Sequence, residues 1–509
     1  MSADVQSPSG NGGVMSRLRE MMRNPISIVG LATALVAFGN FAFLFFVDLT
    51  SAHPSPYVGI LAYMVVPAFL VLGLVMIPLG IWYDRKKRRE GKPDSGRYFT
   101  INFSDPSQRG AIAFLGSFVI AFIGLSVVGS YKAYEFTDSV QFCGQLCHTV
   151  MNPEYTAYQQ SPHARVACVD CHVGAGATWY VKSKLSGARQ VLAVTFNTFP
   201  RPIPTPVHDL RPAADTCEQC HWPKKFYGAQ LKVFTHYGSD EKNTPRQIRL
   251  LIKTGGGDPA TGAPEGIHWH MNISNEISYV SSDDRRQVIP YVHVKDQQGR
   301  VTEYFASDSK MSKEQLAKAP LRRMDCIDCH NRPTHIYVPP DQSVDQALLA
   351  RRIDVSLPFI KQQAVTALTG NYATTDAAVS AIAKDLESFY ESKYPDLVKT
   401  KQLEIRTAIE EVQRMYRNTM FPEMKVNWQT HPNNIGHFYY NGCFRCHDGQ
   451  HTSPDGKTIS KDCTSCHVVL SQIEGATTMS TVQGAPFQHP VDLGDMTQVN
   501  CSDCHSGTQ

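Results

Sequence analysis

The stretch Cys168-Val169-Asp170-Cys171-His172 decides the fold, because the chain of 509 residues repeats its pattern. All 14 cysteines form close pairs, and a histidine follows each pair at once. With 19 histidines in the chain, chance would give this with a probability of about 10⁻¹⁰, and neither a disulfide framework nor zinc ribbons explain it. The pairs are Cys143/Cys147, Cys168/Cys171, Cys217/Cys220, Cys326/Cys329, Cys443/Cys446, Cys463/Cys466 and Cys501/Cys504.

The pattern Cys-x-x-Cys-His is typical of c-type haem attachment, in which two thioethers hold the porphyrin and the adjacent histidine reaches the iron. The sequence therefore predicts seven covalent haems, attached outside the cytoplasm. Because Cys143 and Cys147 are separated by three residues instead of two, a disulfide stays open as the alternative for that pair. The expected proximal ligands are His148, His172, His221, His330, His447, His467 and His505.

Eleven further histidines follow the first motif, which is enough to give most irons a sixth ligand and a low-spin state. Alternation in His268-Trp269-His270 would point both histidines to one face. There, either one histidine is a ligand and the other its hydrogen-bonding neighbour, or the two are ligands of separate irons. The candidates for sixth ligands are His163, His335, His437 and His451, close to a motif, and His236, His268, His270 and His489.

Three apolar stretches precede the first motif, at about 26–47, 57–82 and 110–130, and each is long enough to cross a bilayer. The basic residues cluster before the first stretch and between the second and third. The positive-inside rule then places the N-terminus in the cytoplasm and everything after Tyr131 outside. The sequence thus predicts an inner-membrane anchor with periplasmic haem domains.

The charge of the chain divides along the same boundary. Residues 1–110 carry a net +4 and residues 111–509 a net −1. Each ferric haem with two ionised propionates adds about −1, so the outer part would carry about −8 and attract a basic, soluble electron carrier. The chain lacks the clustered basic face of a nucleic-acid-binding protein.

The motifs predict a mainly α multihaem cytochrome c, and the three apolar stretches predict three N-terminal transmembrane helices. We expect an anchor at 1–130, a tetrahaem domain at 131–340 with a small antiparallel β insertion at 222–325, a helical spacer at 341–420, and a trihaem domain at 421–509. Strands of the insertion are expected at 247–253, 277–280 and 287–294.

Two details of the later regions follow from the same pattern. In the spacer, Ser343 with Gln346 suggests a capping box and Thr374 or Thr375 a second helix start. The last cluster holds three motifs in 63 residues, so its porphyrins would form the core.

The first four motifs resemble the NapC/NirT family of membrane-anchored multihaem quinol dehydrogenases, over about 40% of the chain. With seven motifs and three spans, the whole chain is similar to heptahaem inner-membrane cytochromes of metal-reducing bacteria. The resemblance rests on Cys143-Gly144-Gln145-Leu146-Cys147-His148-Thr149-Val150-Met151, Ser161-Pro162-His163, the stretch from Trp179 to Gln190, the motifs at Cys168, Cys217 and Cys326, and His335.

This resemblance implies that menaquinol is oxidised at the outer face of the membrane and that periplasmic c-type cytochromes accept the electrons. It implies Met151 as a ligand of the first haem, and His163 and His335 as sixth ligands of the fourth and second haems. It also places Lys182 or Lys184 beside the quinol. Residues 179–199 mix apolar and basic side chains as an interfacial helix does, so contact of these lysines with lipid headgroups is the alternative.

Two other functions stay open. A multihaem reductase of nitrite or a similar oxyanion needs an open iron, often marked by a lysine in place of the motif histidine, and all seven motifs here end in histidine. An electron-transfer subunit whose quinol site lies on a partner chain would carry the same motifs.

Overall fold

The computed structural model describes residues 25–50, 65–90, 135–146, 148–173, 177–207, 210–222, 226, 228–256, 266–271, 275–296, 298–474, 477–494 and 499–509, with scattered residues between 106 and 132. These residues form two compact units. One unit comprises residues 1–142 and 173–187, and the other comprises residues 143–172 and 188–509. Each unit is described by itself.

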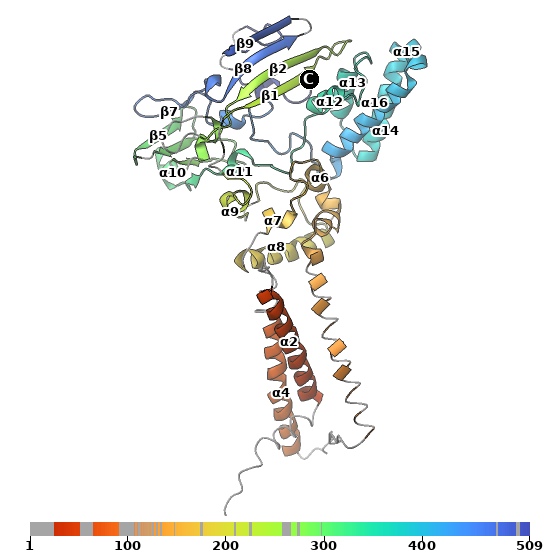
Figure 1. The fold of residues 1–509 in the computed structure, drawn as a ribbon, viewed down its shortest axis with the longest axis vertical. Coiled ribbons are helices and arrows are strands. Elements are labelled where there is room, and N and C mark those ends of the chain that lie inside the picture. Colours follow the sequence, from red (N-terminus) through yellow and green to blue (C-terminus); the bar gives the residue numbers. More distant parts are fainter. Residues whose placement is uncertain are drawn as a thin grey trace, which may run out of the picture. The chain divides into compact units, whose positions relative to one another are not determined.

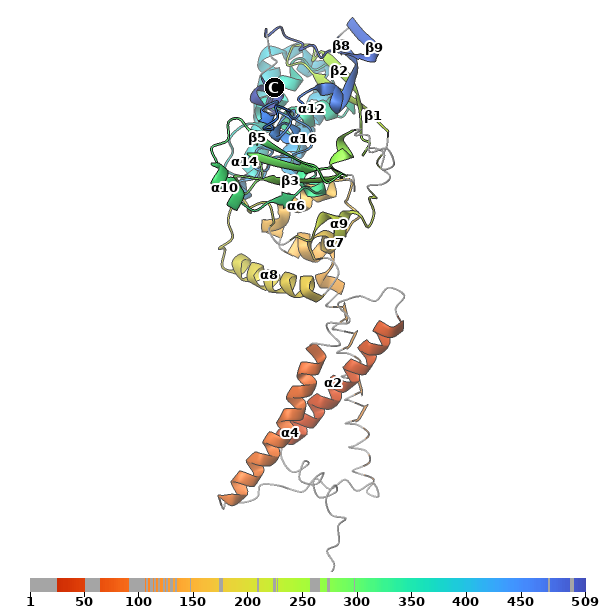
Figure 2. The ribbon, with the colours of Figure 1, turned by 90° about the vertical axis from the view of Figure 1, so that its left-hand side faces the viewer.

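Two long apolar helices form the membrane anchor. Helices α2 (Pro25–Thr50) and α4 (Val66–Arg89) pack side by side (Figures 1 and 2), and both are long and apolar enough to cross a membrane. Gly30 and Gly73 let the two backbones approach closely, since a Cβ at Gly73 would lie 2.6 Å from the Gly30 carbonyl oxygen. The third predicted span, at 110–130, falls largely outside the described residues.

The second unit is mainly helical, as expected, and short helices carry its haem motifs. A motif that occupies a single helical turn brings its two cysteines and its histidine close together. The helices of this region are η2 (Phe142–Leu146), α6 (His148–Gln159), α7 (Cys168–His172), α8 (Ala177–Thr195), α9 (Ala213–Cys217), α11 (Cys326–Cys329), η6 (Gly442–Arg445), η7 (Cys463–Ser465) and α17 (Cys501–Cys504). Helix α8 carries no motif, and Phe142 and residues 177–187 belong to the first unit.

Two antiparallel sheets replace the single small sheet predicted for the insertion (Figure 1). Each sheet combines strands of the insertion with strands of the last haem cluster, two in one sheet and one in the other, because strand edges left open by the insertion pair with β8 and β7. One has the order β1-β2-β8-β9, with β1 (Gln230–Tyr237), β2 (Pro245–Ile252), β8 (His467–Glu474) and β9 (Thr477–Ala485). The other has the order β6-β3-β4-β5-β7, with β6 (Arg322–Arg323), β3 (Glu276–Val280), β4 (Tyr291–Lys295), β5 (Val301–Ala306) and β7 (His451–Thr452). Helices η4 (Ile267–Met271) and α10 (Lys313–Lys318) lie in the same insertion.

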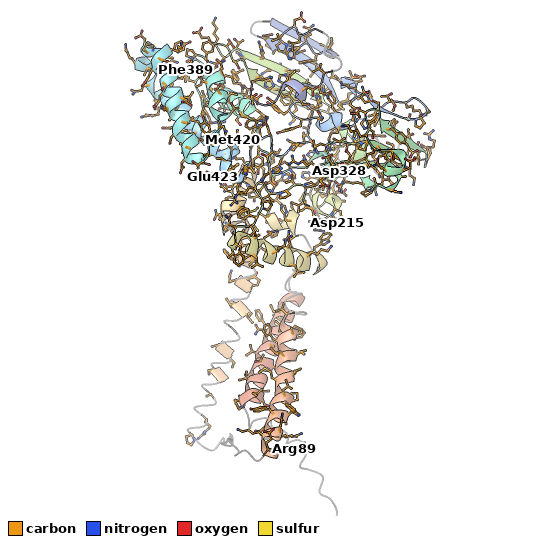
Figure 3. The ribbon with its side chains drawn as sticks, turned by 180° about the vertical axis from the view of Figure 1, so that it is seen from behind. Arg89, Asp215, Asp328, Phe389, Met420 and Glu423 are labelled. Carbon is orange, nitrogen blue, oxygen red and sulfur yellow. The ribbon has the colours of Figure 1, made fainter. Side chains whose placement is uncertain are left out.

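The predicted spacer is helical and contributes most of the main hydrophobic core. Thr374 caps α14 by accepting from the Ala377 amide, as expected. Glu423, which is labelled in Figure 3, accepts a second bond, from the Thr375 amide. The capping box expected at Ser343 is wrong, because α12 already begins at Pro340 and Ser343 is buried inside it. The elements are α12 (Pro340–Leu349), α13 (Ile360–Leu368), α14 (Thr375–Lys393), α15 (Pro395–Thr400), α16 (Gln402–Thr419) and η5 (Pro422–Met424).

Candidate haem centres

Six motif histidines each face one histidine from elsewhere in the chain. The ring centres of these pairs are 5.8–6.3 Å apart. In the order of the motifs, the pairs are His172 with His335, His221 with His163, His330 with His268, His447 with His270, His467 with His437, and His505 with His489.

This spacing fits a haem iron between two imidazoles. A metal–nitrogen bond of about 2.0 Å on each side, plus roughly 1.1 Å from each nitrogen to its ring centre, gives about 6 Å. Among the described residues there is no cluster of three or more His, Cys, Asp or Glu side chains placed to hold a metal ion. The paired histidines fit a haem, whose iron they would hold from its two sides.

Backbone carbonyls fix the orientation of several of these imidazoles. His268 Nδ1 donates to the Thr254 carbonyl at 2.7 Å, and His270 Nδ1 donates to the Ile267 carbonyl at 2.8 Å. His489 donates in the same way to the Val491 carbonyl at 2.8 Å. With Nδ1 engaged, Nε2 is left to face the partner histidine, which is how metal-ligating histidines are usually held.

Helix η4 serves two different motifs. His268 faces His330 of the fourth motif with ring planes 3° apart, whereas His270 faces His447 of the fifth at 86°. Of the two arrangements that the sequence allowed for His268-Trp269-His270, the structure therefore shows the one with separate partners. This single helical turn joins the first four motifs to the last three.

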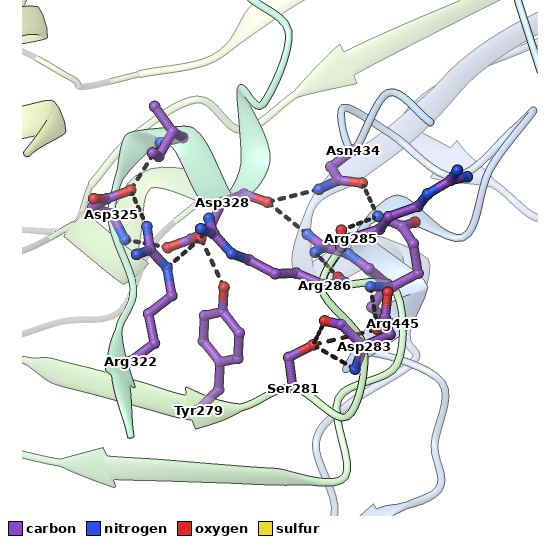
Figure 4. A network of polar contacts seen from close by, with 12 residues as sticks. Tyr279, Ser281, Asp283, Arg285, Arg286, Arg322, Asp325, Asp328, Asn434 and Arg445 are labelled. Atoms are coloured by element: carbon purple, nitrogen blue, oxygen red, sulfur yellow. Dashed lines mark hydrogen bonds and ion pairs between the residues drawn. The ribbon is translucent and has the colours of Figure 1, made fainter. Parts of the chain in front are cut away.

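A buried network around Asp328 holds the same two motifs together (Figure 4). The Asp328 carboxylate, 2% exposed, accepts from Tyr279, Arg286 and Arg322. Its backbone carbonyl accepts from Arg445, which lies between Cys443 and Cys446 of the fifth motif. The carboxylate and its partners are satisfied inside the protein, as a buried charge requires.

Cysteines of consecutive motifs are also neighbours in space. A hydrogen bond with Cys143 lowers the pKa of Cys168 to about 7. Cys217 and Cys326 share a similar hydrogen bond, which raises the pKa of Cys217. Weaker electrostatic contacts join Cys171 with Cys217, Cys329 with Cys443, Cys443 with Cys466, and Cys463 with Cys501. The order of the motifs in the sequence is therefore also their order as neighbours.

The third motif departs from the single helical turn that carries the fourth and the last. Its first cysteine, Cys217, is half-buried and its second, Cys220, is exposed, as in the fourth and last motifs. The difference is that α9 ends at Cys217, so Cys220 follows in a turn, with its amide donating to the Cys217 carbonyl at 3.1 Å. The His221 amide donates to the same carbonyl at 2.8 Å, which keeps the histidine close to the first cysteine. Haem attachment at Cys220 stays a prediction, at a surface position.

Two histidines predicted as ligands are engaged elsewhere. His451 is buried with both ring nitrogens bonded, Nδ1 to Asp448 at 2.9 Å and Nε2 to the Ile289 carbonyl at 2.7 Å, so neither is left for an iron. His236 binds Asp345 through Nδ1 at 3.1 Å and stacks on Phe438. Phe438 in turn stacks on His505, so a phenyl ring takes the place between these two histidines that a haem would need.

One expected assignment changes partner. His335 faces His172 of the second motif, in agreement with the family pattern. His163, expected at the fourth haem, faces His221 of the third motif instead, and the fourth motif takes His268 from the insertion. His268 lies far from His330 in the sequence, and His163 far from His221, so local spacing could not reveal this exchange.

The remaining predicted residues belong to the first haem and the quinol site. The side chains of His148 and Lys184 lie outside the described ones, as does Cys147. Met151 is half-buried on α6, next to buried Val150. Lys182 is exposed on α8, with its Nζ 4.9 Å from the centre of the Trp179 ring.

Sequence reasoning missed Glu154. This residue on α6 contacts His335 through both its backbone carbonyl and its carboxylate. The two residues are 181 positions apart, and no motif links them. Only the folded chain shows the contact.

The comparisons with known proteins agree with this geometry. The model of the N-terminal region of the NapC/NirT cytochrome c family matches residues 106–202. The chain is 46% identical over 484 residues to the cytochrome c-type protein ImcH of Geobacter sulfurreducens, an alignment that covers 95% of each chain. It is also 33% identical over 109 residues to the cytochrome c-type protein NrfH of Wolinella succinogenes, which covers 20% of this chain and 60% of that protein. No solved structure matches the chain significantly. The chain therefore belongs to the NapC/NirT family of membrane-anchored, haem-binding cytochromes c of electron transport.

Proposed function

We propose that this protein oxidises menaquinol at the periplasmic face of the bacterial inner membrane and passes the electrons through seven covalent haems to periplasmic c-type cytochromes. This is a quinol:cytochrome c oxidoreductase activity, in respiration directed toward extracellular metals. The observation that carries the proposal is the set of six histidine pairs with ring centres 5.8–6.3 Å apart.

The pairs favour electron transfer over a reductase. A reductase of nitrite needs an iron with an open position, whereas an iron held by two histidines, as each of the six pairs would hold it, has none. Bound haems supply one-electron redox chemistry. The chain supplies the ligands, fixes their orientation, and keeps consecutive motifs within electrostatic contact.

Lys182 and Lys184 on α8 are the proposed quinol-site residues. Oxidation of a quinol releases two protons, so a polar group beside the reacting hydroxyl is needed. The cation–π contact of Lys182 with Trp179 is of the kind found at a membrane interface, where Trp and Lys side chains gather. The outer part of the chain carries a net −1, and the propionates of its haems would add to this negative charge. This charge supports a basic acceptor cytochrome, reached by electrostatic attraction.

Stopped-flow mixing of the oxidised full-length protein with a menaquinol analogue tests the proposal. We expect haem reduction in the wild type. In Lys182→Ala and Lys184→Ala the rate of reduction should fall by about tenfold or more, with the haem content unchanged. Lys232→Ala, which removes an exposed lysine from β1, is the matched control and should reduce as the wild type does. Wild-type protein that dithionite reduces and no quinol reduces would refute the proposal and favour a quinol site on a partner chain.

A further inference from the structure

Among the imidazoles of the six pairs, His335 has an anionic neighbour. Its Nδ1 lies 3.0 Å from the backbone carbonyl oxygen of Glu154 and 3.2 Å from the carboxylate oxygen Oε2 of the same residue. In the part of the chain that the structure describes, no other histidine of these pairs lies within ion-pair distance of a carboxylate. Glu154 is thus in a position to act on the ligand of a single haem, the second.

The Glu154 carboxylate is held in place by a buried arginine. Arg332, 6% exposed, donates to both its oxygens at 3.1 and 3.3 Å. The Nε of Arg332 also donates to the His335 carbonyl at 2.6 Å. The two hydrogen bonds from the Arg332 guanidinium pair this carboxylate with a cation, which favours its ionised form.

The other pairs show what a less polarised ligand looks like. The sixth ligands His268, His270 and His489 donate to neutral backbone carbonyls. Nδ1 of His467, in the pair of the sixth motif, is buried without a hydrogen-bond partner among the described residues. The ligand histidines of this chain therefore differ in what lies next to Nδ1. Within the described part of the chain, Nδ1 has no partner in His467, a carbonyl in His268, His270 and His489, and a carbonyl together with a carboxylate in His335.

We propose that Glu154 is a positioning residue that lowers the reduction potential of the second haem through His335. A carboxylate oxygen 3.2 Å from Nδ1 adds to the polarisation that the Glu154 carbonyl imposes on the N–H bond, so the imidazole becomes a stronger donor at Nε2. A stronger donor stabilises ferric over ferrous iron. This inference rests on the ligation of the second haem by His172 and His335. It follows that the second haem becomes easier to reduce when the carboxylate is removed.

The test is a redox titration of the full-length protein, followed by optical and electron paramagnetic resonance spectroscopy, for Glu154→Gln against the wild type. We expect one low-spin haem to become easier to reduce, with its reduced-to-oxidised ratio at fixed potential rising about tenfold, which is ~59 mV for one electron. Glu154→Asp keeps the charge at a shorter reach and should give a smaller shift of the same haem in the same direction, which carries the test if Glu154→Gln loses haem.

Glu411→Gln is the matched control. Glu411 is also a buried carboxylate paired with arginines, but it lies on α16 and contacts no histidine, and its loss should leave every potential unchanged. The proposal is overturned if Glu154→Gln keeps all potentials, if Glu411→Gln produces the same shift, or if the second haem becomes high-spin, since the carboxylate would then only hold the ligand in place. A wild-type protein that quinol does not reduce would refute the proposed function and leave this result unaffected.

Discussion

His270 and His451 show at the residue scale why proximity to a motif does not make a histidine a ligand. Both residues lie close to the fifth motif, His270 against His447 and His451 four positions after it. His270 keeps Nε2 free, whereas His451 uses both ring nitrogens within the protein. A histidine can therefore bind an iron only where the fold leaves one of its ring nitrogens without a hydrogen bond.

The contrast between His270 and His451 supports two matched predictions. His270→Ala should leave seven covalent haems but turn one of them from low-spin to high-spin, because the thioether bonds and His447 stay in place. His451→Ala should keep every haem low-spin and lower the free energy of unfolding by about 1–3 kcal/mol, because buried partners lose their hydrogen bonds. Electron paramagnetic resonance of the oxidised proteins and denaturant titration check the two halves, and a high-spin haem in His451→Ala would contradict the account.

At the scale of elements, the close packing of α2 and α4 depends on Gly30 and Gly73. A Cβ at Gly73 would lie 2.6 Å from the backbone nitrogen of Ala34, too close for any real contact. Ser27 adds a hydrogen bond across the helix pair, from its hydroxyl to the Ile77 carbonyl at 2.9 Å. Small residues of this kind allow apolar helices to associate within lipid.

Gly73→Leu should force the two helices apart and destabilise the anchor by about 1–3 kcal/mol, the usual cost of overpacking. The control is Gly116→Leu, at a position where an added Cβ meets nothing within 4 Å. Denaturation of the detergent-extracted protein measures the difference. Equal stability of the two variants would show that the helix pair does not depend on this contact.

Helix α16 contains a carboxylate that links stability to pH. Glu411 accepts from Arg352 at 2.6 Å and from Arg414 at 2.6 and 2.7 Å. Burial works against its ionisation, but the bonds from Arg414 and Arg352 prevail and lower the pKa of Glu411 from 4.5. A lowered pKa in the folded state stabilises the fold above pH 4.5, and this contribution disappears as the pH falls through the folded-state pKa.

Glu411→Gln should therefore make α16 less stable at pH 7 by about 1 kcal/mol, a modest value because both arginines are partly exposed. Hydrogen exchange of the α16 amides measures the loss. The difference from the wild type should shrink as the pH falls below 4.5, where the wild-type carboxyl also becomes protonated. A difference that is constant from pH 7 to pH 3 would contradict this explanation.

For the whole molecule, sequence reasoning succeeded where a pattern is local. Local patterns identified the motifs, a helix start at Thr374 or Thr375, of which Thr374 is the cap, and the strand around 247–253, which is β2. It failed where distant segments meet, as in the pairing of β2 with β8, the exchange of His163 to the third motif, and the contact of Glu154 with His335. These features depend on tertiary packing, for which one sequence carries no local signal.

At the same scale, the central claim is that the chain holds seven haems, of which six have two histidine ligands and a low-spin state. The most direct measurement counts the haems per chain by pyridine haemochrome and sorts them by near-infrared magnetic circular dichroism of the oxidised protein. The account predicts seven haems per chain, with the band of bis-histidine ligation accounting for at least six. Fewer than seven haems, or more than one haem with an open or non-histidine axial position, would contradict it.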